Sequence, residues 1–180
     1  MTFTHRFATR ADLPALLALI DAAIAELQKD FLDRRQIASS RAIMGLDTAL
    51  VDDRTYFVVE SGGRIAGCGG WSRRATLYGG DHSAGRDAAL LQPGQDPAKV
   101  RAMYTHPDFA RRGVGRLILS LSEAAAAAEG FTVLELMATL SGEPLYRAAG
   151  FVPVERLHDD AGGVPVPLVR MRKPIVAGPR

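Results

Sequence analysis

The stretch Ala110-Arg111-Arg112-Gly113-Val114-Gly115-Arg116 carries the strongest structural signal in the sequence. It lies between an extended run, Lys99 to Thr105, and a strong helical pattern, Val114 to Glu129. This order predicts a strand, a tight glycine-bearing turn and the first turn of a helix. Backbone N–H groups at a helix start lack internal partners and lie at the positive end of the helix dipole. Gly113 and Gly115 are expected to let another molecule approach these amides closely. The three arginines add positive charge, so the stretch predicts a site for a phosphate-rich ligand, most simply a pyrophosphate.

Two common phosphate-binding patterns do not fit this turn. A mononucleotide-binding loop ends in Gly-Lys-Ser or Gly-Lys-Thr, whereas Gly113 is followed by Val114. A dinucleotide-binding fingerprint needs a small residue three positions after its second glycine, where this chain has Ile118. The pattern that fits is Arg/Gln-x-x-Gly-x-Gly/Ala, with Ala110 in place of its usual first residue. The alternative interpretation is an ordinary Gly/Arg turn before an amphipathic helix.

A second motif, Leu145-Tyr146-Arg147-Ala148-Ala149-Gly150-Phe151, follows the first after one helical and one extended pattern. The two motifs, in this order, resemble the acyl-CoA loop and the Phe/Leu-Tyr-x-x-x-Gly-Phe signature of the GNAT superfamily of N-acetyltransferases. The resemblance runs from about Phe3 to Lys173 and is most specific from Met103 to Phe151. Each motif alone is weak evidence, but together they favour the family over an unrelated turn.

Hydrophobic spacing along the rest of the chain predicts a mixed α/β fold around one sheet. We expect a single domain over residues 1–175 and a C-terminal tail at 176–180. The family resemblance implies that the strands carrying Met103 and Leu136 run parallel and splay apart, with helices flanking the sheet. The expected strands are 3–8, 55–60, 64–72, 99–105, 131–137, 151–157 and 164–171, and the expected helices follow Asp12 and span 33–44, 114–129 and 143–149.

The resemblance also implies where acetyl-CoA, the expected co-substrate, binds. The backbone of Met103, Tyr104 and Thr105 would hold the acetyl carbonyl and the pantetheine amides, with the pantetheine arm lying between the splayed strands. The pyrophosphate would lie on the backbone amides of the turn, at Arg111, Arg112, Gly113, Val114, Gly115 and Arg116.

Tyr146 corresponds to the tyrosine that points at the CoA sulfur in many family members. The resemblance therefore implies that Tyr146 protonates the leaving thiolate, while the backbone N–H near Met103 stabilises the oxyanion. The alternative role for Tyr146 is a half-buried core aromatic with a satisfied hydroxyl. Thr139 stands where many members carry an asparagine that contacts CoA.

The group that takes the proton from the acceptor amine stays open at this stage. Lys99 occupies the strand position at which histone-type members carry a glutamate. The candidates are Asp81, His82, Asp96, Glu135 and a water molecule, with His106 beside the cofactor strand as a further one.

Three segments with the weakest resemblance are expected to select the acceptor. They are Ala22 to Met44, the long loop Ala75 to Pro97 and the turn Asp159 to Val164. A loop this long inside a compact domain is usually functional or mobile. We expect it to cover the acceptor side of the cleft and to close on binding; the alternative is a surface insertion.

Composition narrows the function classes further. The chain has 180 residues, 47% hydrophobic and 23% charged, which suits one globular domain with a sizeable core. The net charge is only +2 and no Lys/Arg block carries interleaved aromatics, so no nucleic-acid partner is expected. The single cysteine, Cys68, is expected to be a small buried residue, and neither cysteines nor histidines have metal-site spacing, so no metal is expected. No apolar run is long enough for a membrane span and no signal-peptide core is present, which favours a cytoplasmic protein without a membrane partner.

The expected function is acetyl-CoA-dependent transfer of an acetyl group to a primary amine of a small molecule or peptide, by direct attack. One alternative is a non-catalytic acyl-CoA-binding regulatory module of the same fold. Another is transfer of an acyl group larger than acetyl. A homodimer is a further option, because dimerisation is common in the superfamily.

Overall fold

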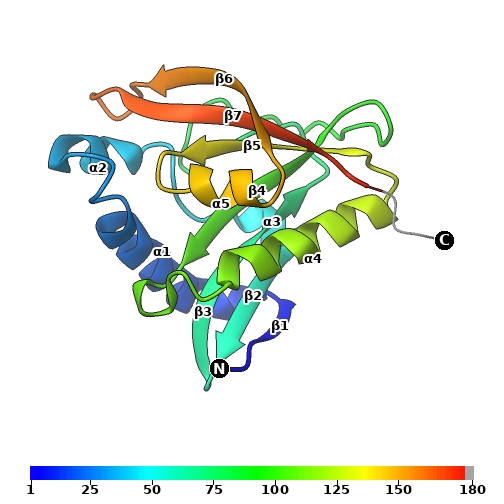
Figure 1. Cartoon of the computed structure of the whole chain (residues 1–180), viewed down its shortest axis with the longest axis horizontal. Coiled ribbons are helices and arrows are strands. Elements are labelled where there is room, and N and C mark those ends of the chain that lie inside the picture. Colours follow the sequence, from blue (N-terminus) through cyan, green and yellow to red (C-terminus); the bar gives the residue numbers. More distant parts are fainter. Residues whose placement is uncertain (177–180) are drawn as a thin grey trace.

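The β-rich run that begins at Tyr56 folds back through a Gly62-Gly63 turn to form the hairpin β2 (Tyr56–Ser61) and β3 (Arg64–Ser72). In the computed structural model, which describes residues 1–176, this hairpin lies within one seven-stranded mixed sheet (Figure 1). The strand order is β1-β2-β3-β4-β5-β7-β6, and only β4 and β5 are parallel. The other strands are β1 (Thr4–Phe7), β4 (Ala98–Thr105), β5 (Val133–Thr139), β6 (Val152–Asp159) and β7 (Val166–Pro174).

The helices cover both faces of the sheet. They are α1 (Leu13–Leu27), α2 (Arg34–Ser40), α3 (Thr48–Asp52), α4 (Val114–Ala128) and α5 (Glu143–Ala148), with short 3₁₀ turns η1 (Arg10–Asp12) and η2 (Pro107–Phe109). The expected α/β fold with a mixed sheet and flanking helices is confirmed.

Successive residues of β3 point to opposite faces of the sheet, so the strand contacts both layers of the core. Cys68 points into the cluster that includes Leu16, Ile20 and Ile24 of α1. On the other face, a Cβ added at Gly69 would lie 2.9 Å from Ile118 Cγ2 of α4. The glycine therefore lets α4 pack directly on the sheet backbone. Cys68 is fully buried, as expected, and burial raises the pKa of its thiol to about 12.

The region before β2 differs most from the expectation. The expected helix at 33–44 ends at Ser40, because the Ser39 and Ser40 hydroxyls bond to backbone carbonyl oxygens of Val164 and Ile37. A further short helix, α3, was not expected. Asp47 caps it by accepting a hydrogen bond from the Ala49 backbone N–H at 3.0 Å.

The predicted parting of the two parallel strands is present. β4 and β5 pair only at Ala98↔Leu134 and Lys99↔Glu135, although both strands continue well beyond those positions. Figure 1 shows β5 and β7 diverging from β4 toward α2 and α5. The fold therefore leaves the second half of β4 without a strand neighbour on its β5 side.

Two further expectations concern the ends of the chain and membranes. Residues 177–180 of the expected tail lie outside the described residues, and the single domain over residues 1–175 stays a prediction. None of the helices in residues 1–176 combines the length and apolar character that a membrane span requires.

Candidate active site

The first feature of the site is a distortion in β4 at the point where it leaves β5. Between the paired positions Gly70↔Arg101 and Cys68↔Tyr104, two residues of β4 face one residue of β3. This is a β-bulge. Its first residue, Ala102, has a φ of +52°, a left-handed conformation that is unfavourable for a residue with a side chain.

A buried tyrosine holds this bulge in place. The Tyr56 hydroxyl donates a hydrogen bond to the Ala102 carbonyl oxygen at 2.7 Å. Tyr56 is fully buried, and burial raises the pKa of its phenol well above the usual value. The Ala102 carbonyl and the Met103 N–H belong to one planar trans peptide and point in opposite directions. The hydrogen bond from Tyr56 therefore fixes the Met103 N–H in an orientation away from Tyr56.

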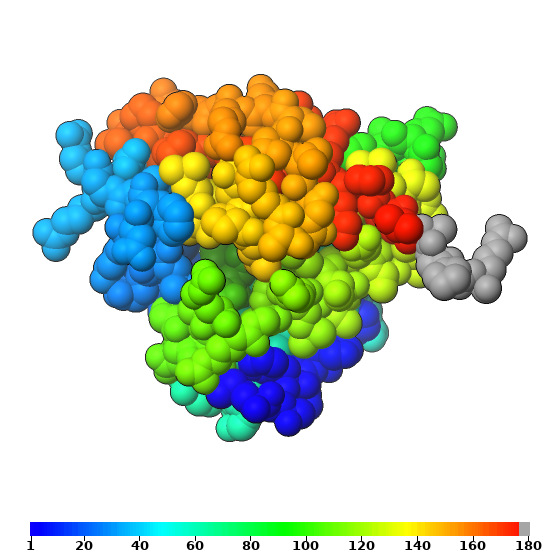
Figure 2. Space-filling view, in the orientation of Figure 1, coloured from blue at the N-terminus to red at the C-terminus, as the bar shows by residue number. Residues whose placement is uncertain are grey.

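The bulge opens into a hollow between the parted strands. Space-filling shows a recess on this face, between the turn that leads into α4, the α2 region and α5 (Figure 2). The hollow is lined by residues 43–45, 77–79, 100–104, 136, 137, 139, 146 and 168. Among these, Arg101 is the only charged residue, and its guanidinium is paired with Asp47 at 2.8 Å.

Tyr146 reaches the hollow from α5. Its ring packs edge-on against Phe151 with the centroids 5.9 Å apart, and Gly142 leaves room for it, because a Cβ there would lie 2.9 Å from Tyr146 Cε2. The hydroxyl has no hydrogen-bond partner within residues 1–176. Burial raises its pKa to about 12, so the phenol is protonated at neutral pH. Tyr146 therefore offers an uncommitted proton donor at the hollow.

The turn between η2 and α4 presents a row of free amides. Within residues 1–176, the backbone N–H groups of residues 111–116 make no hydrogen bond, and the first bonded amide is that of Leu117, which donates to the Gly113 carbonyl at 3.0 Å. Arg111 and Gly113 have φ values of +60° and +89°, which turn successive amides toward a common side. This arrangement, at the N-terminus of a 15-residue helix, suits an anionic ligand.

The second glycine of the turn has a different role from the one expected. The sequence suggested that Gly113 and Gly115 both allow a ligand to approach the amides. A Cβ added at Gly113 meets nothing within 4 Å, but one at Gly115 would lie 2.6 Å from Leu145 Cδ2. Gly115 therefore makes room for α5, which carries Leu145 and Tyr146, against the first turn of α4.

The side chain of Tyr104 has a structural role, which is separate from the proposed role of its backbone in binding the co-substrate. Its hydroxyl accepts a hydrogen bond from the Gly45 N–H at 2.8 Å, which attaches the segment between α2 and α3 to β4. Met103 packs between the two clusters on the α4 face of the sheet. Thr139 lines the hollow, where its hydroxyl bonds to Ser141 at 3.0 Å.

None of the side chains suggested as the general base lines the hollow. Asp81 accepts a hydrogen bond from the Thr48 N–H, and Asp96 accepts one from the Gln92 N–H. His82 bonds through Nε2 to the Arg41 carbonyl, and His106 accepts from the Asp108 N–H. These four side chains stabilise turns and helix ends, so their geometry does not support a role in proton transfer.

Glu135 is held in an ion-pair network away from the hollow. Its carboxylate contacts Lys99 at 2.6 Å, Arg172 at 2.5 Å and Arg170 at 3.0 Å. Burial raises the pKa of Glu135, but the hydrogen bonds from Lys99 and Arg172 outweigh this effect and lower it. A carboxylate surrounded by three cations is a weak base, which argues against Glu135 as the proton acceptor.

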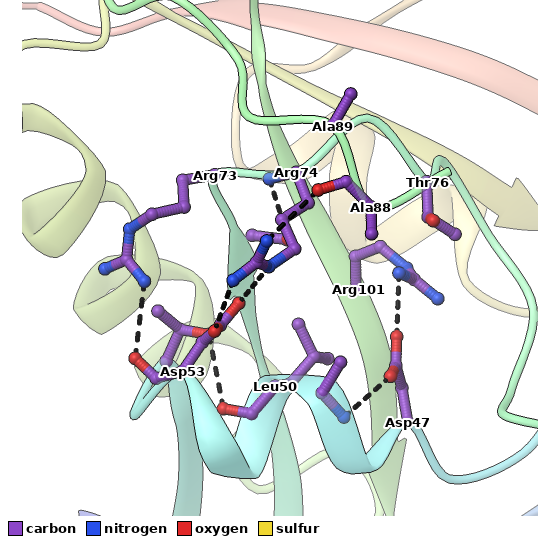
Figure 3. A network of polar contacts seen from close by, with 12 residues as sticks. Asp47, Leu50, Asp53, Arg73, Arg74, Thr76, Ala88, Ala89 and Arg101 are labelled. Carbon is purple, nitrogen blue, oxygen red and sulfur yellow. Dashed lines mark hydrogen bonds and ion pairs between the residues drawn. The ribbon is translucent and has the colours of Figure 1, made fainter. Parts of the chain in front are cut away.

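The loop Ala75 to Pro97 is tied to the rest of the fold by charged side chains. Figure 3 shows Arg74, just before the loop, paired with Asp53 at 2.7 Å, and Arg101 paired with Asp47. Arg86 of the loop also reaches Asp47, at 2.9 Å. The loop segment 77–79 lines the hollow, and closure of the loop on binding stays a prediction.

Two tyrosines, one that lines the hollow and one that holds the bulge beside it, carried no sequence signal. Tyr56 and Tyr78 stood in a strand pattern and an irregular loop, with no motif around them. Tyr78 lines the hollow and its hydroxyl donates to Asp159 Oδ2 at 2.6 Å. The only available signal was that Tyr78 and Asp159 both fall in segments expected to select the acceptor.

The comparisons with known proteins agree with this geometry. Residues 52–153, more than half of the chain, match the model of the acetyltransferase (GNAT) domain family. The chain belongs to this family. It is therefore an acetyltransferase of the acetyl-CoA-dependent type, as the two sequence motifs indicated. A search of curated proteins gave no match.

Solved structures of this family share the fold over nearly the whole chain. A GCN5-related N-acetyltransferase from Rhodopseudomonas palustris is 20% identical with a TM-score of 0.71, over 97% of this chain and 96% of the other. The PaiA N-acetyltransferase from Thermoplasma acidophilum, in complex with coenzyme A, is 12% identical with a TM-score of 0.63, over 97% and 99%. The ribosomal-protein-S18-alanine N-acetyltransferase from Escherichia coli is 18% identical with a TM-score of 0.60, over 98% and 97%. At these identities the likeness shows the fold.

The buried pair between Asp47 and Arg101 supports a prediction about stability. Both side chains are almost fully buried, so replacing Asp47 by Ala leaves the Arg101 guanidinium without a counter-charge. We expect a loss of about 3–5 kcal/mol in the free energy of unfolding, measured by urea denaturation, and faster hydrogen exchange in residues 75–97.

Asp53→Ala is the matched control for Asp47→Ala. It removes a carboxylate from the same network, but its partner Arg74 is one-third exposed, so the cost should be about 1 kcal/mol or less. Equal losses in the two variants would contradict the assignment of Asp47 as the buried anchor of the loop.

Proposed function

We propose that the protein transfers the acetyl group of acetyl-CoA to a primary amine of a small molecule or an exposed peptide by direct attack. The observation that carries this proposal is the hollow between β4 and β5, where an oriented backbone N–H and an uncommitted phenol meet. The named activity of the Escherichia coli neighbour, on an alanine of a ribosomal protein, is consistent with an amine acceptor but does not identify the one used here.

The residues of the turn and of β4 would hold the co-substrate. The free amides of residues 111–116 would bind the pyrophosphate, assisted by the charges of Arg111, Arg112 and Arg116. The exposed edge of β4 at Met103, Tyr104 and Thr105 would pair with the amide groups of the pantetheine arm, as an added strand does. Both surfaces are of the kind that needs hydrogen-bond partners from outside the protein.

Acetyl-CoA supplies an activated thioester, and two groups of the protein would assist its reaction with an amine. The Met103 N–H, oriented through Tyr56, would donate to the carbonyl oxygen as negative charge develops on it. The Tyr146 hydroxyl would donate its proton to the departing sulfur. Burial raises the pKa of Tyr146 to about 12, so its hydroxyl is protonated at neutral pH and the proton is present when the sulfur departs.

A second candidate function is an acyl-CoA-binding module without catalysis. It is favoured by one observation, that no carboxylate or imidazole among residues 1–176 lines the hollow directly. Release of free thiol from acetyl-CoA, measured with a panel of alkyl amines, amino acids and short peptides, separates the two functions. Acetylated product confirmed by mass spectrometry supports the enzyme; binding of acetyl-CoA without product from any acceptor supports the module.

The pyrophosphate site leads to a prediction about affinity. Arg116 lies on the first turn of α4 and makes no ion pair within residues 1–176, so its replacement breaks no such contact in the fold. Arg116→Glu should weaken CoA binding at least tenfold, roughly 1.4 kcal/mol, in calorimetric titrations at low salt. The difference should shrink at high salt, because ions screen exposed charges.

The control for this prediction is Arg35→Glu, which makes the same charge change on the exposed surface of α2. It should leave CoA affinity unchanged. If both variants lose affinity equally, net charge alone attracts CoA and the turn at 111–116 is not its site.

Tyr146 gives a prediction about rate. Tyr146→Phe keeps the ring against Phe151 and removes only a hydroxyl without a partner, so the melting temperature should change little. The kcat for acetyl transfer should fall by roughly 10²-fold, at the low end for general-acid catalysis. The KM for acetyl-CoA should stay nearly constant, because the interaction is made in the transition state. Full activity in this variant would assign the proton to water or to another group.

A further inference from the structure

An amine that attacks a thioester must lose a proton, and the hollow holds no obvious base. No Asp, Glu, His or Lys side chain lines it within residues 1–176, and its one charged residue, Arg101, is paired with Asp47. The remaining polar side-chain groups are hydroxyls: those of Thr139 and of three tyrosines. The proton acceptor, if it belongs to the protein, must therefore act through one of these hydroxyls.

The three tyrosine hydroxyls differ in what they contact. The Tyr104 hydroxyl is fully committed, because it accepts from the Gly45 N–H and donates toward the Gly45 carbonyl. The Tyr146 hydroxyl has no partner in the described part of the chain. Only the Tyr78 hydroxyl is bonded to a carboxylate, as it donates to Asp159 Oδ2 at 2.6 Å. A phenol whose proton already points to a carboxylate has its oxygen lone pairs free to accept another proton.

We propose that Tyr78 and Asp159 form the proton relay that deprotonates the acceptor amine. The inference rests on the proposed N-acetyltransfer. As the new C–N bond forms, the proton of the amine nitrogen passes to the Tyr78 oxygen, and the Tyr78 proton passes to the Asp159 carboxylate. The bond between the carbonyl carbon and sulfur then breaks, and the thiolate takes the Tyr146 proton. Asp159 afterwards releases its proton to water, and water returns one to Tyr146.

The surroundings of the pair suit this role. The ring of Tyr78 packs against the apolar cluster that contains Val166 and Leu168 of β7, which limits its movement. The Ala161 N–H donates to Asp159 Oδ1 at 2.9 Å, which fixes the carboxylate and leaves Oδ2 for Tyr78. Burial, together with the hydrogen bond to Asp159, raises the pKa of Tyr78 to about 12. Tyr78 therefore stays a phenol at neutral pH and transmits a proton without becoming a stable phenolate.

Few other titratable groups lie close to Asp159 in the chain. β7 faces it with the uncharged Val166, its partner in the strand register. Next to it in sequence are His158 and Asp160, both exposed. Further along β6, Arg156 is paired with Glu143 and Glu155 with Arg170. The loop contributes Tyr78 itself.

The relay also assigns a chemical purpose to two segments without motifs. Tyr78 comes from the long loop and Asp159 from the end of β6, 81 residues later in the sequence. Asp47 binds Arg86 of the loop and Arg101 of β4, and Arg101 donates a hydrogen bond to the carbonyl of Gly79, next to Tyr78. These contacts hold Tyr78 in place at the hollow. A rigid loop is what a proton relay needs, because proton transfer depends on hydrogen-bond distance.

The test compares Tyr78→Phe, Asp159→Asn and the double variant with the wild type, using an amine that the wild type acetylates. Each single variant should lower kcat 10- to 100-fold at pH 7, with an unchanged affinity for CoA and an unchanged KM for acetyl-CoA. The double variant should be no slower than the slower single variant, because the two groups act on one proton.

The pH dependence of kcat separates a relay from a structural effect. The activity of both single variants should recover toward high pH, where hydroxide accepts the proton in place of the relay, and a purely structural loss would not recover. Glu155→Gln, which removes a negative charge from the same strand, should keep the kcat and the pH profile of the wild type.

Two results would overturn the relay: wild-type kcat in Tyr78→Phe or Asp159→Asn at pH 7, or a double variant whose loss is the product of the single losses. Neither result would contradict the proposed function, because that function is tested separately by turnover of the wild type with the amine panel. Unfolding curves of all variants show whether a loss of rate reflects a loss of folded protein.

Discussion

The site depends on one constraint, the hydrogen bond from Tyr56 to the carbonyl of Ala102 at the bulge in β4. The left-handed conformation of Ala102 is unfavourable in itself and persists because the surrounding structure holds it. Shortly before this bulge β4 loses β5 as its neighbour, having paired with it only at Ala98 and Lys99. The result is a strand edge with unpaired backbone groups inside the sheet rather than at its margin. Such groups need hydrogen-bond partners, which a ligand can provide.

Two features arrange the rest of the site around this edge. Gly115 allows Leu145 to lie directly on the first turn of α4, so the helix that presents free amides also positions the helix that presents Tyr146. On the opposite side, the buried Asp47 carboxylate joins α3, the long loop and β4 through Arg86 and Arg101. Residues 77–79 of the loop therefore form part of the wall of the hollow.

Lys99 stands at the strand position where histone-type members of the family carry a glutamate, and in this chain it has a structural role. Lys99 forms a buried ion pair with Glu135, and two arginines of β7 complete the network. Because the cations lower the pKa of Glu135, this network stabilises the junction of β4 and β5 instead of accepting a proton. In the proposed reaction, deprotonation of the amine is then left to the acceptor side of the hollow, where Tyr78 contacts Asp159.

The sequence predicted the parts of the molecule that depend on local patterns. The strand, turn and helix around residues 110–116, and the motif ending at Phe151, could be read directly, because their turns and amphipathic spacing are local properties. The mixed α/β fold class followed from the hydrophobic spacing along the chain, and the parting of the two parallel strands from the family resemblance that these motifs carry. The short helix α3 was missed because a five-residue helix has too few positions for a periodic signal.

Contacts between distant segments could not be predicted in the same way. The Tyr56–Ala102 and Tyr78–Asp159 hydrogen bonds join residues 46 and 81 positions apart, and neither residue of either pair lies in a motif. The role of Gly115 was misread for the same reason, since its neighbour Leu145 comes from another helix. Asp81, His82 and Asp96 looked like candidate bases by residue type, but their local backbone contacts direct them elsewhere.

The central claim is that Tyr56, through the Ala102 peptide, aims the Met103 N–H at the thioester carbonyl. It can be tested without knowing the acceptor, by isotope-edited infrared spectroscopy of acetyl-CoA labelled with ¹³C at the carbonyl. The carbonyl stretch should move to lower frequency when acetyl-CoA binds the wild type, because a hydrogen bond weakens the C=O bond. In Tyr56→Phe, which keeps the buried ring, most of this shift should disappear while acetyl-CoA still binds. An identical shift in both proteins would contradict the account, because the carbonyl would then be polarised by a group that does not depend on Tyr56.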